Sequence, residues 1–347
     1  MNGMVYYECM KNFWAEDREE PPTGPQFQSL MLTQIDPNKK FSELSNFLRK
    51  YTRRQATYQR DIVNAIISVI RKILGESHGR HRFGVPLVAF ESFLCFHVVT
   101  EGYEYLERRE TLPSWSWSAW RGPMGWTIPE TDPEVLEWIA GSTWIVWYIR
   151  DLYQPPTLIW DVAGSDKSLA RVQTEQILAG RLAKIRQFSA VDLPTLPSRD
   201  VPRTYELQRN LLQFWTFSAS FNLRVDRRAE AYLKSLEVAD WKVALNIHDE
   251  HGKCRGFIYV DEEIFHDDHD EAELIVISKN PLYIYYDYDM FYHRKRVKEM
   301  ENAEWYGVLY VVEKSGIAER KGFGHIYGEE FRLSLDSEWD WKEIILG

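Results

Sequence analysis

The densest group of side chains that could bind a metal ion is the run His266-Asp267-Asp268-His269-Asp270-Glu271. Imidazole nitrogens and carboxylate oxygens are common ligands of zinc and calcium. Consecutive residues of one loop seldom converge on an ion, however, and the run has neither the calcium-loop spacing nor the H-E-x-x-H spacing of a zinc-binding helix. We therefore expect a solvated acidic loop here, with no bound metal and no cofactor.

Nucleophilic catalysis has little support in the sequence. No serine lies in a G-x-S-x-G turn, and none of the three cysteines, Cys9, Cys95 and Cys254, has a histidine directly beside it that would lower its pKa. The odd number and wide spacing of the cysteines favour free thiols over a disulfide framework. Because Asp and Glu are numerous, a glycosidase that uses two carboxylates remains an open alternative.

Aromatic side chains gather between Leu112 and Trp120, where three tryptophans fall within six residues. Trp115 and Trp117 alternate with small serines at the two-residue period of a strand, and a bulge after Ala119 would return Trp120 to the same side. Such a strand either fills a core beneath helices or forms an exposed platform that stacks on a sugar or a base. We expect the core strand, because exposed indoles are few.

The residues before this stretch are predicted to form helices. Apolar side chains recur at three- and four-residue spacing over residues 41–50, which is the pattern of an amphipathic helix. A second helix is expected over 57–74, ended by a glycine, and a third over 86–97, entered through a proline. Most of the circumference of the second helix is apolar, so we expect it to be buried on more than one side.

Charged and polar residues surround the expected start of the second helix. Thr57 is suited to cap its first turn, and Asp61 lies where the helix dipole favours a carboxylate. Together with Arg54 these residues could form a catalytic group. A capping and ion-pair role explains them more simply, so we expect a structural function.

Beyond Gly125 the hydrophobic period changes to two, which predicts strands. The expected strands cover residues 143–150, 211–223, 241–248, 256–260, 274–278, 282–286, 307–313 and 331–335. Two of these strands, 241–248 and 256–260, are predicted to form a hairpin across the polar turn 249–253. Residues 169–188 fit either a helix or a strand. The glycines of 316–324 indicate a turn between two strands, since no Lys-Ser/Thr pair of a phosphate loop follows them.

The net charge and the apolar runs of the chain indicate which classes of partner it is expected to bind. The chain of 347 residues carries a net charge of −10, which argues against a nucleic-acid partner. The N-terminus has no basic segment followed by an apolar one, and the longest apolar run, near residues 144–149, is far too short to cross a bilayer. We expect no membrane partner and a cytoplasmic location.

Several segments resemble, in order, the signatures of fungal heterokaryon-incompatibility (HET) domain proteins. The clearest is Arg108-Arg109-Glu110-Thr111-Leu112-Pro113-Ser114-Trp115-Ser116-Trp117-Ser118-Ala119-Trp120-Arg121-Gly122, which is similar to RR-x-x-(F/L)-P-S-W-S-W-A-G-W-x-G. Shorter matches lie at residues 6–9, 51–65, 83–91, 316–324 and 341–347. The signature residues, all expected to be structural, are Arg54, Thr57, Asp61, Arg108, Arg109, Pro113, Ser114, Trp115, Trp117 and Trp120.

In HET proteins these segments follow the HET domain, a module related to TIR domains whose L-S-Y-V-W-G-like motif is not found in this chain. The resemblance implies that the chain begins just after such a domain. It implies a structural or recognition part of fungal non-self recognition and incompatibility cell death, with a protein partner and no catalysis of its own. The alternative function is a carbohydrate-binding module or a glycoside-active enzyme that uses the aromatic face.

Together these patterns predict an α+β fold. Residues 1–125 would form a helical subdomain that ends in the tryptophan strand. Residues 126–347 would form a β-rich subdomain with mostly antiparallel strands.

Overall fold

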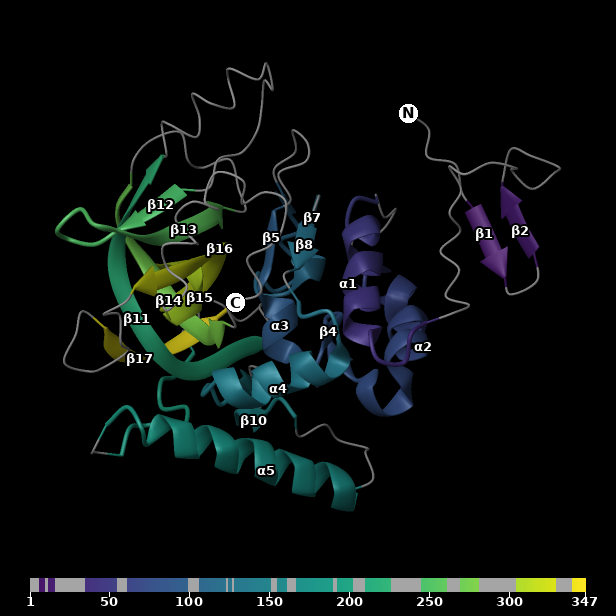
Figure 1. The fold of residues 1–347 in the computed structure, drawn as a ribbon, viewed down its shortest axis with the longest axis horizontal. Helices are drawn as coiled ribbons and strands as arrows, with labels where there is room; N and C mark the ends of the chain where they lie inside the picture. The colour runs from purple at the N-terminus through teal and green to yellow at the C-terminus, as the bar shows by residue number, and fades with distance from the viewer. Residues whose placement is uncertain are drawn as a thin grey trace.

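The computed structural model describes residues 6–9, 12–15, 35–54, 61–98, 106–122, 124–126, 128–150, 155–160, 167–189, 192–201, 210–225, 245–260, 269–280, 304–328 and 339–347. Within these residues a large, mainly antiparallel sheet lies beside a group of helices (Figure 1). The predicted combination of helices with antiparallel β-structure is thus confirmed.

The helices are α1 (Lys40–Tyr51), α2 (Ile67–His78), α3 (Phe90–Leu94), α4 (Asp132–Ser142) and α5 (Lys167–Ile185), with short 3-10 turns at Asn64–Ile66 and Trp117–Ala119. The strands of the large sheet are β9 (Tyr148–Arg150), β10 (Thr157–Leu158), β11 (Leu211–Val225), β12 (Leu245–His248), β13 (Cys254–Val260), β14 (His269–Asn280), β15 (Glu304–Lys314), β16 (Ile317–Gly328) and β17 (Asp340–Leu346). Short strand pairs are β1–β2 (Tyr6–Cys9, Asn12–Ala15), β3–β4 (His81–Arg82, Val85–Pro86), β5–β8 (Phe96–Val98, Met124–Trp126) and β6–β7 (Glu107–Arg108, Trp120–Arg121).

Six strands of the large sheet form a closed barrel. The pairing runs β11-β12-β13-β16-β15-β14, and β14 pairs back onto β11. Strand β11 makes this closure possible because it is long enough to pair with β9 and β17 in its first half and with β12 and β14 in its second. Closing the sheet leaves these strands without a free edge between β11 and β14.

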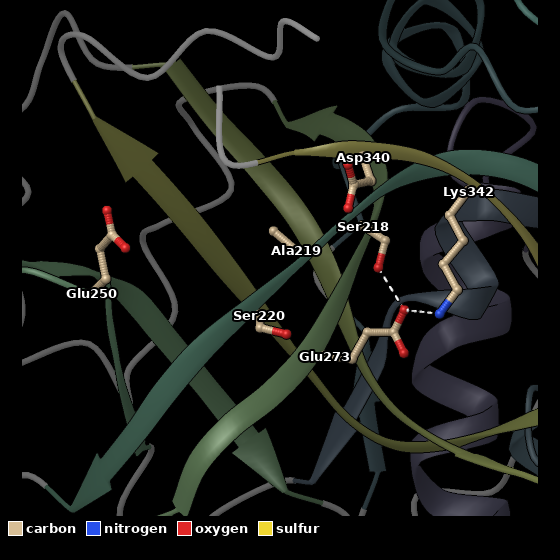
Figure 2. Close-up of a pocket in the computed structure, with 7 residues that line it drawn as sticks. All are labelled: Ser218, Ala219, Ser220, Glu250, Glu273, Asp340 and Lys342. Atoms are coloured by element: carbon tan, nitrogen blue, oxygen red, sulfur yellow. Dashed lines mark hydrogen bonds and ion pairs between the residues drawn. The ribbon is translucent and has the colours of Figure 1, made fainter. Parts of the chain in front are cut away.

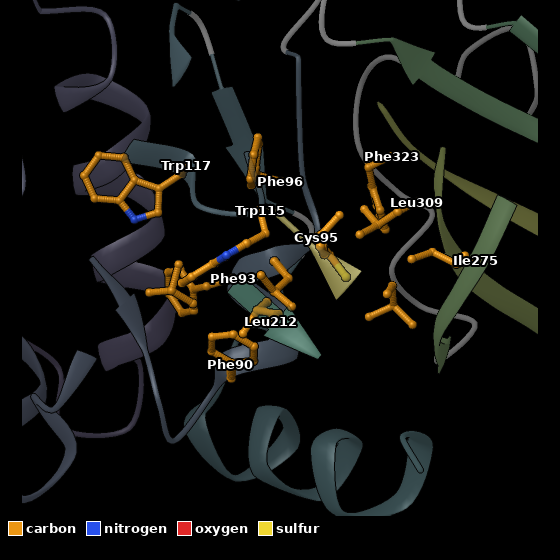
Figure 3. Packing of buried hydrophobic residues seen from close by; sticks show 14 of the residues in the cluster. Phe90, Phe93, Cys95, Phe96, Trp115, Trp117, Leu212, Ile275, Leu309 and Phe323 are labelled. Atoms are coloured by element: carbon orange, nitrogen blue, oxygen red, sulfur yellow. The ribbon is translucent and has the colours of Figure 1, made fainter. Parts of the chain in front are cut away.

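The core continues from the helices into the barrel. Residues 274–278 of β14 and 305–311 of β15 are buried without alternation, because both faces of these strands are covered. One cluster of buried side chains joins Phe90 and Trp117 on the helical side to Leu309 and Phe323 of the barrel (Figure 3). It also crosses the expected division at residue 125, where Phe96 of β5 pairs with Trp126 of β8.

The predicted helices are only partly correct. The first is confirmed as α1, but α2 begins ten residues later than expected, at Ile67, after a short 3-10 turn. Gly75 interrupts α2 with a positive φ of 79°, which a glycine adopts without strain. The expected helix over 86–97 is confirmed only at α3, Phe90–Leu94, because β4 ends at Pro86 and β5 begins at Phe96.

The tryptophan stretch is not the strand that we expected. Ser116 caps a 3-10 turn over Trp117–Ala119, its hydroxyl accepting a hydrogen bond from the backbone N–H of Ser118, and only Trp120 and Arg121 belong to a strand. The serines therefore do not form a separate, small face. Ser114, Ser116 and Ser118 are as completely buried as the indoles between them.

In the second half the strand predictions are largely confirmed where the structure describes them. The hairpin of β12 and β13 pairs Leu245 with Ile258, and α5 resolves the ambiguous residues 169–188 as mainly helical. Most of 143–150 is not a strand, since β9 covers only its last three residues. The glycine-rich segment 316–324 is also different from the expectation: the turn lies at Ser315–Gly316, and the later glycines are inside β16. The expected strands 282–286 and 331–335 lie outside the described residues.

Candidate functional site

The three tryptophans of the signature lie inside the core. Trp115, Trp117 and Trp120 have no solvent exposure, which confirms the expected core position and makes the exposed-platform interpretation wrong for these rings. The indole nitrogen of Trp120 donates to the carbonyl of Ser114 at 2.8 Å. Trp117 packs edge-on against Tyr51, with ring centroids 6.2 Å apart. None of the three rings is available to a ligand.

Ser114 connects this stretch to the end of the sheet. Its backbone N–H donates to the carbonyl of Gly347 at 2.9 Å, and its hydroxyl donates to the same oxygen. The hydroxyl also accepts from the backbone N–H of Arg320 at 3.0 Å. Segments that are about 200 residues apart in sequence therefore meet at one buried side chain. We call this group, Ser114 with Arg320 and Gly347, the serine joint.

Arginines surround the serine joint. Arg109 is buried and donates to the carbonyls of Ser118, at 3.2 Å, and Trp120. Burial is the main cause that lowers the pKa of Arg109, and the charge of Arg121 adds to it. Arg108 lies over the Trp120 ring, 5.3 Å from its centroid. Because these groups satisfy backbone carbonyls, they hold the stretch in shape and leave no charge directed at a ligand.

The other signature residues lie apart from the joint. Pro113 is buried beside it, whereas Arg54 and Asp61 are exposed on either side of residues outside the description, which include Thr57. Within the described residues no ion pair joins Arg54 and Asp61. Since α2 begins only at Ile67, Asp61 does not lie in its first turn, so the expected interaction of Asp61 with the dipole of that helix is wrong.

A polar hollow of about 630 Å³ opens beside β11, β14 and β17 (Figure 2). Its described lining is formed by Ser218, Ala219, Ser220, Glu250, Glu273, Asp340 and Lys342. The pairing of Ser218 with both Asp340 and Ile275 places these side chains at the point where β11 passes from one neighbour to the other. No sequence motif indicated this group, because its members come from distant strands.

The centre of the hollow is a hydrogen-bonded set of three residues. The Ser218 hydroxyl and the Lys342 ammonium both donate to one oxygen of Glu273, each at 2.6 Å. Burial lowers the pKa of Lys342, but hydrogen bonding and attraction to Glu273, with a weaker contribution from Glu313, outweigh it and raise the pKa overall. Lys342 is therefore a cation at neutral pH and cannot accept a proton from Ser218.

This chemistry suits binding better than nucleophilic catalysis. Carboxylate oxygens of Glu250, Glu273 and Asp340 can accept hydrogen bonds from a polar ligand, while Lys342 partly balances their charge. No aromatic ring lies among the described lining residues, so stacking on a sugar ring is not provided there. Among the described residues there is also no group of three or more metal-binding side chains. Of the run 266–271, residues 266–268 lie outside the description, and His269, Asp270 and Glu271 begin β14 rather than forming the expected loop.

A buried ion pair on the helical side is a second charged group that the sequence patterns did not reveal. Arg181 of α5 contacts Glu91 of α3 at 2.6 Å, and Trp147 donates to the same carboxylate oxygen at 2.6 Å. The pair is closed to solvent, because the side chains of Arg181 and Glu91 are only 6% and 2% exposed. Glu91 is part of the 83–91 match to the HET pattern, which was the available signal.

Family models, curated proteins and solved structures were each compared with the chain, and none matches it. No described helix is long and apolar enough to cross a membrane.

Proposed function

We propose that this chain is a structural and recognition part of a HET-type fungal protein and has no catalytic activity of its own. The observation that carries the proposal is the serine joint. There the signature segments 108–122, 316–324 and 341–347, separated along the chain, contact one another through Ser114. Signature residues that build one buried joint are explained by a common fold, and not by a common reaction.

Neighbouring segments of the resemblance meet the same joint. The Ser116 hydroxyl donates to the carbonyl of Phe83 at 2.7 Å, and the backbone N–H of Gly122 donates to the carbonyl of Thr52 at 3.1 Å. These contacts lie within residues 1–125 and support the finer proposal that this part forms one helical unit, which the serine joint connects to a β-rich part over 126–347.

For the partner we propose a protein in the cytoplasm of a fungal cell. The net charge of −10 supports a protein over a nucleic acid. The carbohydrate alternative loses its original support, because the tryptophans that suggested it have no exposed surface.

The proposal is tested by expressing the chain in a filamentous fungus, alone and joined behind a HET module from another protein. We expect growth arrest only from the joined protein, because the L-S-Y-V-W-G-like motif of the HET module is not found among these residues. The purified chain is incubated with NAD in parallel, and no turnover is expected. Growth arrest by the chain alone, or NAD turnover that disappears in Glu273→Gln, would contradict the proposal.

A further inference from the structure

One face of the β11–β17 pair carries two indoles and a buried carboxylate. Register places Trp215 opposite Glu343 and Phe217 opposite Trp341, and side chains two residues apart on a strand share a face. Gln213 continues the same row on β11. We call the row formed by Gln213, Trp215, Trp341 and Glu343 the indole face.

An extended segment crosses the indole face. Residues 192–201, with the sequence D-L-P-T-L-P-S-R-D-V, have no helical or strand structure, and we call them the strap. Exposed and half-buried residues alternate along the whole strap, and none of its residues is buried. Pro194 and Pro197 each fix φ near the value of a polyproline II helix, which favours an extended conformation before any contact is made.

The two indoles bind the strap through its backbone. The Trp341 indole nitrogen donates to the carbonyl of Pro194 at 2.8 Å, and the Trp215 indole nitrogen donates to the carbonyl of Leu196 at 2.9 Å. These carbonyls are two residues apart, which matches the two-residue alternation of exposed and half-buried residues along the strap. The Leu196 side chain points away and is 68% exposed.

Glu343 binds the next part of the strap. Its two oxygens accept from the backbone N–H groups of Ser198, at 2.7 Å, and Arg199, at 3.0 Å, and from the Ser198 hydroxyl at 2.6 Å. The side chains of Gln213 and Arg150 donate to the carbonyl of Arg199, each at 2.9 Å. Backbone atoms of the strap thus contact the indole face from residue 194 to residue 199.

This arrangement is that of a peptide in a binding groove. Indole N–H groups that bind carbonyls of a proline-containing extended segment are typical of domains that recognise proline-rich peptides. Most of the contacts are made to backbone atoms of the strap, so peptides of other sequences can bind in the same conformation. Side chains are read at two positions: Ser198, through Glu343, and Arg199, whose guanidinium donates to the Glu343 carbonyl at 3.0 Å and lies 3.5 Å from Glu313.

We propose that the indole face is a peptide-binding groove, occupied in this structure by the strap of the same chain. Its ligand in another protein is an extended peptide of the form Pro-x-x-Pro-Ser-Arg, which binds when the strap is displaced. The inference names a partner for the proposed recognition role and rests on that role for its biological meaning. Its test is a binding measurement without a HET module, so the two proposals can fail separately.

The test measures binding of a fluorescein-labelled synthetic peptide with the sequence of residues 192–201 to the full-length chain by fluorescence anisotropy. The tethered strap competes at an effective concentration on the order of millimolar, so the unchanged chain binds weakly. Ser198→Pro removes the N–H and the hydroxyl that Glu343 binds, and weakens the strap without changing the groove. We expect this variant to bind the peptide about tenfold more tightly or better, with Ser198→Ala between it and the unchanged chain.

Two controls identify the groove. Asp192→Ala, at the exposed start of the strap, should bind the peptide like the unchanged chain. Trp215→Phe and Trp341→Phe, each combined with Ser198→Ala, should reverse the gain because they remove the indole donors. Melting curves check that every variant is folded, and Ser198→Ala decides the result if Ser198→Pro does not fold. The proposal is overturned if folded strap variants bind no better than the unchanged chain, or if the Trp→Phe changes leave the gain intact.

Discussion

Ser114 shows how much a single small side chain contributes to this fold. It contacts Gly347 and Arg320 from a position where its exposure is zero. A larger side chain has no room there, and a smaller one leaves polar backbone atoms without a partner. The serines of the signature are therefore explained by the hydrogen bonds that they make within the core. The tryptophans of the signature are explained by the core volume that their indole rings fill.

Replacing Ser114 with Ala should destabilise the protein by about 1–3 kcal/mol, since the buried N–H of Arg320 loses its acceptor. Urea denaturation gives the free energy of unfolding. Ser220→Ala, at an exposed position on β11, is the matched control and should change it by less than about 0.5 kcal/mol. Equal effects of the two substitutions would argue against the role of Ser114.

Trp117→Ala should cost about 3–5 kcal/mol, because the lost indole leaves a cavity that a packed core closes only in part. The ring also contacts the loop at Gly84, where an added Cβ would lie 2.4 Å from an indole carbon. Leu136→Ala, on the exposed side of α4, serves as the control. A melting temperature of the Trp117 variant within a degree or two of the parent would contradict the core position.

His325 makes stability depend on pH. Burial, together with the nearby His97, lowers the pKa of His325 to about 3. The unfolded chain takes up a proton below about pH 6.5, which the folded chain does not, so stability should decrease as pH falls, by up to about 1.4 kcal/mol per pH unit. Urea denaturation at pH 7.5, 6.0 and 5.0 measures this slope. His325→Phe should reduce it, and parallel slopes in the two proteins would show that His325 does not contribute.

At the scale of elements, α5 is attached to the rest of the molecule by a buried arginine together with apolar side chains, among which Leu178 and Leu182 are partly buried. Arg181 and Ile185 are its buried residues among those whose exposure is described. Arg181 reaches Glu91 of α3, the carbonyl of Ile145 at 2.6 Å and the Trp160 ring. Residues 169–188 were ambiguous in the sequence because Leu178, Leu182 and Ile185 fit a helix, whereas the flanking residues suggested a strand.

Arg181→Met should destabilise the protein by about 3–5 kcal/mol, because Glu91 then remains buried without its cation. Adding Glu91→Gln should recover part of this loss, since the uncompensated charge is gone. Arg121→Met, which breaks the more exposed pair with Glu107, is the control and should cost at most about 1 kcal/mol. Thermal denaturation of the three variants and the unchanged protein measures these differences, and no recovery in the double variant would contradict the ion-pair explanation.

At the scale of the whole molecule, barrel closure depends on close contact between β13 and β16. Gly256 and Gly324 lie where a Cβ would be 1.9 Å and 2.2 Å from backbone oxygens of the opposite strand. Backbone atoms of paired strands cannot move aside independently. Gly322 and Gly324 of the 316–324 segment are therefore needed for the approach of two strands.

Gly324→Ala should destabilise the protein by about 1–3 kcal/mol or more, as expected for overpacking against backbone atoms. Gly141→Ala, in α4, is the matched control: its added Cβ meets nothing within 4 Å, and a stabilisation of about 0.5–1 kcal/mol is expected. Urea denaturation followed by circular dichroism measures both. A Gly324 variant as stable as the parent would mean that the barrel tolerates separation of β13 and β16.

The sequence by itself determined the local features of this protein. The period of apolar residues located α1, most of β11 and β15, and the β12–β13 hairpin, and the density of tryptophan indicated that the rings are buried. These predictions succeeded because the period of apolar residues and the size of their side chains are properties of residues that are neighbours in the sequence. They say which side of an element is covered, and not what covers it.

Only the tertiary structure decided which distant segments meet. It turned the tryptophan stretch into a 3-10 turn and made β5 out of the expected end of a helix. It also closed β14 onto β11 and brought Ser218, Glu273 and Lys342 together. Such contacts leave no local signal, because each residue contributes one partner to a pair whose other member lies tens to hundreds of positions away. The fold of the whole chain selects these pairs through the burial and hydrogen bonding that they complete together.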